Sequence, residues 1–164
     1  MSSPYRIGFG YDIHQLVIGR KLVLGGVNIP FHKGLKGHSD ADCLTHALAD
    51  AILGAAGLSD IGCYFPNTEE KYKGICSQVI LKKAVEEAKA HGYNLVNADI
   101  TVIAESPKIA SFINEIKATL SITLGIGNSE IGIKATTNEK LGDIGREEAI
   151  ATHAVCLLTS EVDN

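Results

Sequence analysis

Among the 164 residues there is no run of basic side chains and no segment in which aromatic residues alternate with lysine or arginine. The formal net charge is −4, so no broad positive field would attract nucleic acid or an anionic membrane. We therefore expect no nucleic-acid partner. If the substrate is anionic, the compensating positive charge must be local, from a metal ion, a helix N-terminus or one or two lysines.

The four cysteines include no C-x-x-C pair, which argues against both a disulfide framework and a thiolate zinc site. The first residues, MSSPYRIGF, lack the basic and then apolar order of a signal peptide, and no apolar run has the length of a transmembrane helix. We expect reduced thiols, no membrane partner and a cytoplasmic location.

Length and a hydrophobic content of 45% favour a single domain over residues 1–164 with a sizeable core. Apolar residues with period 2 alternate along the chain with apolar residues of period 3.6. These patterns predict strands at residues 5–13, 97–105, 130–136 and 149–160, and a hairpin at 20–31 that turns at Gly25 and Gly26.

Helices are predicted in three segments. The first covers residues 39–57, with Ser39 or Asp40 as its N-cap and Gly57 as its end, and the second covers residues 76–91. The third opens at Ser106–Pro107, read as an N-cap followed by proline at the first helical position. Residues 58–74 are expected to be a loop.

This order of elements predicts an α/β (α+β) fold, a two-layer sandwich of a mixed β-sheet with helices on one face. Strands such as ITVIA have apolar residues on both sides, so the other face also needs cover. We expect subunits to pack sheet against sheet.

Asp12 and His14, in the segment GYDIH, lie two residues apart in a predicted strand and therefore point the same way. The first predicted helix carries Asp42 and His46 one turn apart, with His38 just before it. A carboxylate with two imidazoles matches the ligands of catalytic zinc, which keeps a fourth position open. Each piece alone also fits a structural histidine or a helix cap.

Two further segments allow a functional and an ordinary interpretation. Residues 59–74 are a turn-rich connection, or a long functional loop. After the strand at 130–136, hydroxyls and one carboxylate at Thr136, Thr137 and Glu139 fit a phosphate–Mg²⁺ site, or the solvated tip of a hairpin. Lys108 is similarly either a phosphate ligand beside a helix N-terminus or a surface lysine.

Taken together, residues 10–14, 37–69, 105–109 and 134–142 resemble one family, the 2-C-methyl-D-erythritol 2,4-cyclodiphosphate synthases of the non-mevalonate isoprenoid pathway. The matching segments come in family order and span essentially the whole chain. The resemblance implies a homotrimeric lyase with active sites at subunit boundaries. It would convert 4-diphosphocytidyl-2-C-methyl-D-erythritol 2-phosphate, a nucleotide-diphosphate substrate, to the cyclic diphosphate and release CMP.

The resemblance also implies roles for individual residues. Asp12, His14 and His46 would bind Zn²⁺ or another divalent transition metal, and Glu139 would bind the Mg²⁺ or Mn²⁺ that accompanies the substrate. His38 and Thr137 would act on the reacting phosphates, and Asp42 would cap the helix or support the ligands. Substrate-binding positions would be Ser39, Asp60, Ile61, Gly62, Phe65, Pro66, Asn67, Thr68, Glu69, Ala104, Lys108, Ile109, Ala110, Thr136 and Arg146.

Some features depart from the family. Asp143 stands where several bacterial members have a phenylalanine lining an apolar cavity on the threefold axis, which argues against an isoprenoid diphosphate there. Nothing resembles a fused cytidylyltransferase domain, so we expect the stand-alone form. Two other functions stay open: a non-catalytic metal-binding trimer that senses the nucleotide, and a zinc hydrolase with Glu139 as general base.

Overall fold

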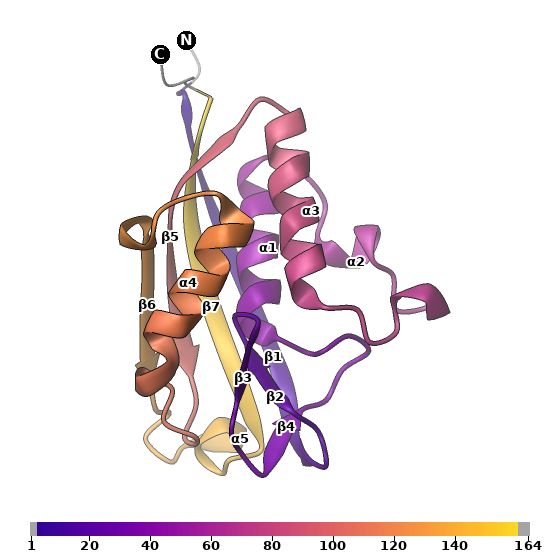
Figure 1. Ribbon diagram of the computed structural model, residues 1–164, viewed down its shortest axis with the longest axis vertical. Helices are drawn as coiled ribbons and strands as arrows, with labels where there is room; N and C mark the ends of the chain where they lie inside the picture. Colours follow the sequence, from indigo (N-terminus) through magenta and orange to yellow (C-terminus); the bar gives the residue numbers. More distant parts are fainter. Residues whose placement is uncertain (1–2, 161–164) are drawn as a thin grey trace.

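Two layers, a sheet and a set of helices, make up the fold in the computed structural model, which describes residues 3–160 (Figure 1). The main sheet has five strands in the order β4-β1-β7-β5-β6. Only β5 and β6 are parallel, so the predicted mixed sheet is confirmed. The strands are β1 (Tyr5–Ile18), β4 (Lys33–Leu35), β5 (Asn94–Ile103), β6 (Ile131–Thr136) and β7 (Ala149–Thr159).

The predicted hairpin forms a small separate sheet from β2 (Leu22–Leu24) and β3 (Val27–Ile29), and it turns at Gly25 and Gly26 as expected. The long helices are α1 (Cys43–Ala55), α3 (Ser77–Ala90) and α4 (Ile113–Leu124), and all lie on one face of the sheet (Figure 1). Short elements complete the chain: α2 (Ile61–Tyr64), α5 (Gly142–Gly145), η1 (Glu70–Tyr72), η2 (Ala110–Phe112) and η3 (Asn128–Glu130).

Helix α1 is the centre of the core. It packs on β1 and β7 on one side and on α3 on the other, so nearly all of its side chains are buried. Leu44, Leu48 and Ile52 are fully buried in it, and Leu81 of α3 is buried beside them. Because burial of such apolar side chains stabilises a domain most strongly, α1 is held rigidly against β1.

The N-cap of α1 was predicted wrongly. Asp42 is the N-cap, and its carboxylate accepts a hydrogen bond from the backbone N–H of Thr45. Ser39 and Asp40 precede the helix, and the Asp40 carboxylate is instead bound to Ser77 at the start of α3. Asp40 lies two residues before the N-cap, and its carboxylate joins this segment to the start of α3. The expected capping role of Asp42 is confirmed.

The start of the third helix was also predicted wrongly. Ser106–Pro107 is a cis peptide bond outside any helix, and α4 begins at Ile113 after η2. The hydroxyl of Ser106 donates to Oε1 of Glu147, 3.0 Å away, so it caps no helix. Lys108 therefore does not lie in the first turn of a helix. The prediction that it binds phosphate beside a helix N-terminus is wrong. The predicted loop at 58–74 contains α2 and η1.

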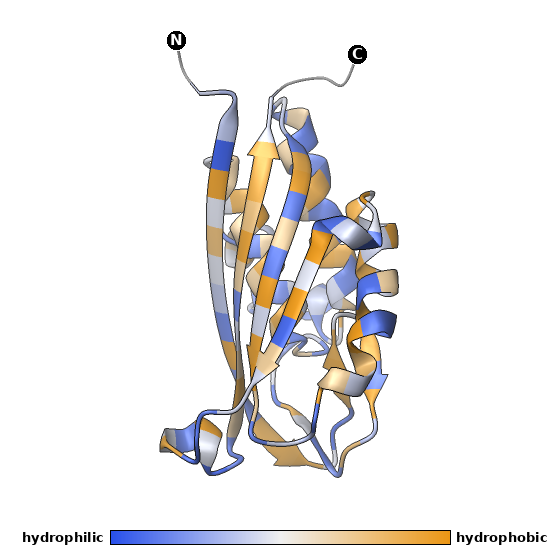
Figure 2. Cartoon of the chain, turned by 90° about the vertical axis from the view of Figure 1, so that its left-hand side faces the viewer, coloured by the Kyte–Doolittle hydropathy of each residue, from blue (hydrophilic) through white to orange (hydrophobic). Residues whose placement is uncertain are grey.

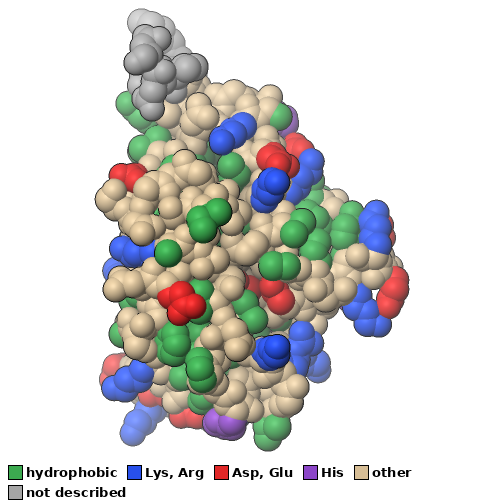
Figure 3. Space-filling model, viewed as in Figure 1, with side chains coloured by type: hydrophobic (Ala, Val, Ile, Leu, Met, Phe, Trp, Pro, Cys, Tyr) green, Lys and Arg blue, Asp and Glu red, His purple; other side chains and the backbone are tan. Residues whose placement is uncertain are grey.

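The face of the sheet opposite the helices is uncovered in the single chain (Figure 2). Along β1, alternate residues on this face carry large apolar side chains, and Ile7 and Phe9 are 76% and 61% exposed. On the helical side, basic and acidic side chains are interspersed, as Figure 3 shows. None of the helices in residues 3–160 is long and apolar enough to cross a membrane.

Candidate functional site

The side chains of Asp12 and His14 point to the helical face of β1 because residues two apart in a strand share a face. His46 comes from the first turn of α1, which crosses directly over this part of β1. The helix can approach so closely because Gly8 and Gly10 of β1 have no Cβ atom. Local alternation and close packing thus bring the residues together from both layers.

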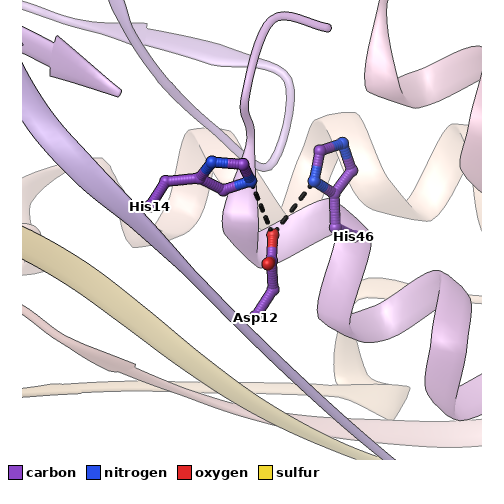
Figure 4. A group of neighbouring side chains, drawn as sticks. All are labelled: Asp12, His14 and His46. Carbon is purple, nitrogen blue, oxygen red and sulfur yellow. Dashed lines mark hydrogen bonds and ion pairs between the residues drawn. The ribbon is translucent and has the colours of Figure 1, made fainter. Parts of the chain in front are cut away.

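Asp12, His14 and His46 form one cluster (Figure 4), called here the DHH cluster. One carboxylate oxygen, Oδ2 of Asp12, lies 3.0 Å from Nε2 of His14 and 3.0 Å from Nδ1 of His46. The candidate ligand atoms of the three residues lie within 4.8 Å of one another. Of the nitrogen and oxygen ligands predicted from sequence, these are the ones that the fold assembles.

The DHH cluster is partly buried, and its environment shifts the pKa values of Asp12 and His14. Burial raises the pKa of the Asp12 carboxyl, but its close contacts with the rings of His14 and His46, and the attraction of their charges when these rings are protonated, outweigh it and lower that pKa below 3.8. Burial lowers the pKa of His14, whereas the hydrogen bond to Asp12 and its negative charge raise it above 6.5. The Asp12 carboxyl therefore stays ionised, and the DHH cluster attracts cations through it.

The second ring nitrogen of each histidine in the DHH cluster is occupied. Nδ1 of His14 donates to the carbonyl oxygen of Lys36, at 2.7 Å, and Nε2 of His46 lies 2.8 Å from the hydroxyl of Ser77. Metal-binding histidines are typically held in this way, since the outer partner fixes the ring and its tautomer. The donor set and its supports fit a divalent metal with nitrogen and oxygen ligands.

The DHH cluster lines a pocket of about 270 Å³. Six further residues of the predicted site line the same pocket: His38, Ser39, Ile61, Gly62, Phe65 and Asn67. Nε2 of His38 is buried there without a hydrogen-bond partner among the described residues. An unpaired buried polar atom in a pocket is a natural contact for a ligand oxygen.

Four predicted substrate residues lie near this pocket but do not line it. The carboxylate of Asp60 caps α2 by accepting from the N–H of Gly62, and Glu69 forms an ion pair with Lys71. Pro66 and Thr68 belong to the same connection between α2 and η1. The sequence prediction missed Gly37, Tyr72, Ile75 and Ile80, which do line the pocket.

Arg20 was also missed. Its guanidinium donates to the carbonyl oxygens of Gly37 and Ser39, at 3.1 and 3.0 Å, on either side of His38. This residue therefore holds the segment that carries His38. A lone arginine beside a predicted hairpin carries no sequence signal for such a role.

A second pocket, of about 180 Å³, lies where β5 and β6 end. It is lined by the predicted residues Ala104, Lys108, Ile109, Ala110, Thr136 and Thr137, together with Glu105, Pro107 and Ala135. The two pockets share no lining residue. Within one chain, the two groups of predicted residues thus lie at two separate pockets.

The loop after β6 carries Glu139, whose Oε1 accepts a hydrogen bond of 2.8 Å from the hydroxyl of Thr137. Glu139 and Lys140 both have positive φ, 51° and 62°, and the Glu105 carboxylate accepts from the N–H groups of Asn138 and Lys140. Glu105 therefore steadies an unusual backbone shape that fixes where Glu139 points.

Arg146 lines neither pocket. Its guanidinium binds Asp143 and lies 3.3 Å, through Nε, from Oε1 of Glu148. The arginine and the family-atypical aspartate are thus paired within one chain at the end of α5.

Comparison with known proteins shows which family the sequence resembles. The sequence profile of the YgbB family matches residues 5–159. A 2-C-methyl-D-erythritol 2,4-cyclodiphosphate synthase of Chloroherpeton thalassium is 54% identical over 153 residues, which cover 93% of this chain and 98% of that protein. A protein of the same name from Neisseria gonorrhoeae is 55% identical over 153 residues, 93% of this chain and 96% of its own.

Solved structures agree with this. The bifunctional IspDF from Campylobacter jejuni matches 96% of this chain with a TM-score of 0.92 and 44% identity, and this chain spans 43% of that longer protein. A CDP complex of IspF from Plasmodium falciparum matches 97% of this chain and 98% of its own, with a TM-score of 0.85 and 38% identity.

Proposed function

This chain belongs to the YgbB family, and from that membership we propose that it catalyses the cyclisation after which its relatives are named. The substrate is 4-diphosphocytidyl-2-C-methyl-D-erythritol 2-phosphate. An oxygen of its 2-phosphate bonds to the β-phosphorus, the bond from that phosphorus to the bridging oxygen breaks, and CMP leaves with that oxygen. The product is 2-C-methyl-D-erythritol 2,4-cyclodiphosphate, an intermediate of isoprenoid synthesis, and the enzyme is a phosphorus–oxygen lyase.

The observation that carries this proposal is the DHH cluster at the wall of a pocket whose other polar lining includes an unpaired nitrogen of His38. Two anionic phosphates must meet in the reaction, so the barrier contains strong charge repulsion. When bound, a divalent metal at the cluster supplies positive charge that polarises a phosphate oxygen. Asp12, His14 and His46 would hold Zn²⁺ or another divalent transition metal there.

The residues of the first pocket then bind the substrate and orient its reacting phosphates. His38, held in place through Arg20, offers its buried Nε2 to a phosphate oxygen. The α2 residues Ile61 and Gly62 and the ring of Phe65 enclose the methylerythritol part of the substrate. Fixing both reacting groups in one pocket converts a flexible chain into an attack geometry, which removes much of the entropic barrier.

The second pocket accommodates the nucleotide end. Lys108, Ile109 and Ala110 would border the cytidine, and the hydroxyls of Thr136 and Thr137, two further residues of the pocket lining, would donate to phosphate oxygens. Glu139 would bind a Mg²⁺ or Mn²⁺ ion carried by the diphosphate, because such ions favour one carboxylate together with phosphate oxygens. CDP in the complex of the Plasmodium falciparum relative is consistent with a nucleotide ligand of this kind.

A homotrimer brings the two pockets together. They share no lining residue within one chain, and the substrate would lie between the first pocket of one copy and the second pocket of a neighbouring copy. The uncovered face of the sheet supplies the contact, since β1 exposes Ile7 and Phe9 there. Contiguous apolar surface of this kind typically marks an interface between proteins. The cytoplasmic location expected from the sequence stays a prediction.

One experiment tests the reaction and separates it from its rivals. The purified protein is incubated with the substrate, Mg²⁺ and Zn²⁺, and the products are followed by ³¹P NMR. We expect the cyclic diphosphate and CMP. A linear product would identify a hydrolase, and binding without turnover would identify a nucleotide sensor.

A further inference from the structure

We propose that Ser77 and Asp40 fix the tautomer of His46, so that its Nδ1 carries no proton and is available to a metal. This inference rests on the proposed function only in taking the DHH cluster as a metal site. Ser77 and Asp40 are then positioning residues, which act on the metal through His46 and touch neither substrate nor ion.

The contacts form a continuous chain from α3 to the cluster. Ser77, the first residue of α3, is fully buried, and its hydroxyl oxygen lies 2.8 Å from Nε2 of His46. The same hydroxyl donates to Oδ1 of Asp40. Oδ2 of Asp40 accepts from the backbone N–H of Ser77 at 2.8 Å, and its Oδ1 also accepts from the N–H of Asp42 at 3.2 Å.

The direction of these hydrogen bonds follows from what each group can donate. An ionised carboxylate only accepts, so the bond between Asp40 and the hydroxyl must use the proton of Ser77. The hydroxyl has no second proton, and it therefore accepts at its contact with His46. Nε2 of His46 must then be the protonated nitrogen. Nδ1 of a neutral imidazole is left as a lone pair.

That lone pair has an unusual neighbour. Nδ1 of His46 lies 3.0 Å from Oδ2 of Asp12, which is also an acceptor and also faces Nε2 of His14. Two acceptors this close repel each other unless a cation or a proton lies between them. Without Ser77 and Asp40, His46 would adopt the other tautomer and donate Nδ1–H to Asp12, which would satisfy both groups with no metal. Ser77 and Asp40 thus favour the metal-bound state of the DHH cluster.

Ser39 is a weaker alternative partner. Its hydroxyl oxygen lies 3.3 Å from Nε2 of His46 and accepts from the N–H of Ala41, and among the described residues it makes no hydrogen bond to the Asp40 carboxylate. Ser39 can accept from Nε2, but nothing in its surroundings obliges it to do so. Ser77 is closer and has its proton committed to Asp40.

The test measures zinc affinity, by competition with a chromophoric chelator, in the parent protein and in three variants. Ser77→Ala removes the acceptor. Asp40→Asn keeps the shape but supplies one acceptor oxygen in place of two, and its amide can donate to Ser77 and reverse the chain. Ser121→Ala is the matched control, since it removes a half-buried hydroxyl of α4 that donates to the carbonyl oxygen of Ile126, just after that helix.

Loss of an outer partner typically weakens metal binding by about 10–100-fold, and we expect this for Ser77→Ala and Asp40→Asn, with Ser121→Ala close to the parent. Should Ser77→Ala fail to fold, Asp40→Asn decides. A merely structural role is excluded by ¹⁵N NMR of labelled histidine. The zinc form of the parent should show His46 protonated at Nε2 and coordinated through Nδ1, and metal-free Asp40→Asn should carry the proton at Nδ1.

Parent-like zinc affinity in both variants, or a zinc form of the parent in which Nε2 is the coordinated nitrogen, would overturn the proposal. The cyclisation assay is read separately. Weakened zinc binding in variants of a parent that does not cyclise would leave the Ser77–Asp40 pair standing and remove the proposed function. Full zinc affinity in variants of a parent that does cyclise would leave the proposed function standing and remove the role of Ser77 and Asp40.

Discussion

A Cβ atom placed on Gly10 would lie 1.9 Å from the carbonyl oxygen of Ala47, which means that β1 and α1 touch backbone to backbone. Asp12 follows Gly10 on the same face of β1, and His46 precedes Ala47 in α1. The distance between two ligands of the DHH cluster is therefore set by a glycine that has no chemistry of its own.

Gly10→Ala should destabilise the protein and weaken its metal site together. The backbone of α1 must move away, and overpacking of this kind costs about 1–3 kcal/mol. Chemical denaturation gives the loss, and chelator competition gives the zinc affinity. The control is Gly54→Ala, at an exposed position of α1 where a Cβ meets no atom within 4 Å. That change should stabilise by about 0.5–1 kcal/mol and leave zinc binding intact. Equal behaviour of the two variants would contradict the packing argument.

The stability of the metal-free protein should fall as the pH rises above neutrality. The pKa of His14 is raised above 6.5, so its protonated form stabilises the fold below that pH, and this contribution is lost as pH rises through the higher folded value. The pKa of Asp12 is lowered below 3.8, so its contribution persists at every pH above that and is lost only in strong acid. Asp12 and His14 together therefore stabilise the fold most between pH 3.8 and pH 6.5, the ordinary pKa values of the two groups.

Zinc should reverse this trend, because it binds neutral imidazole and protons compete with it. The zinc-dependent rise in melting temperature should grow between about pH 6 and 8. Melting curves in chelator and in zinc, for the parent and for His14→Gln, separate this residue from the other histidines. A parent-minus-variant difference that is flat or rising across that range in chelator would count against the assigned shift.

Residue spacing predicted that Asp12 and His14 lie on one face of a strand, because this information is local. The choice of His46 as the third member, instead of Asp42 or His38, was implied by the family resemblance, since His46 lies 34 residues from Asp12. The failures have the opposite origin. Asp40 was taken as a cap for α1, but its partner Ser77 lies 37 residues away, and Ser106 was taken as a cap although it binds Glu147 across the fold. A side chain that can bond locally or distantly does not reveal its choice in the sequence.

The predicted homotrimer should depend on the uncovered face of the sheet. Ile7→Asp places a charge on β1 where the side chain is 76% exposed in the single chain, so folding should survive while assembly is lost. Burying an unpaired carboxylate between subunits is strongly unfavourable. The matched change is Ile122→Asp, at a side chain 85% exposed on α4 in the helical layer, which should leave the mass unchanged. Light scattering at micromolar concentration decides, and a monomeric parent would refute the interface.

The final prediction concerns Glu139, which lies on the loop steadied by Glu105 and accepts a hydrogen bond from Thr137. Glu139→Gln keeps the size of the side chain and removes one negative charge. Zinc binding and assembly should therefore survive, because Glu139 belongs to neither the DHH cluster nor β1. Cyclisation should slow by about 10²–10³, comparable to the loss of a single electrostatic contact at a reacting centre.

High Mg²⁺ should recover part of this loss, since the defect lies in affinity for a cation and not in a missing proton transfer. Glu105→Gln is the informative companion, because it keeps the Glu139 carboxylate and weakens the support of its loop. That variant should show a smaller defect that Mg²⁺ corrects more fully. Slow turnover of Glu139→Gln that is indifferent to Mg²⁺ would make Glu139 a base. Parent-like turnover would place the Mg²⁺ site on other residues.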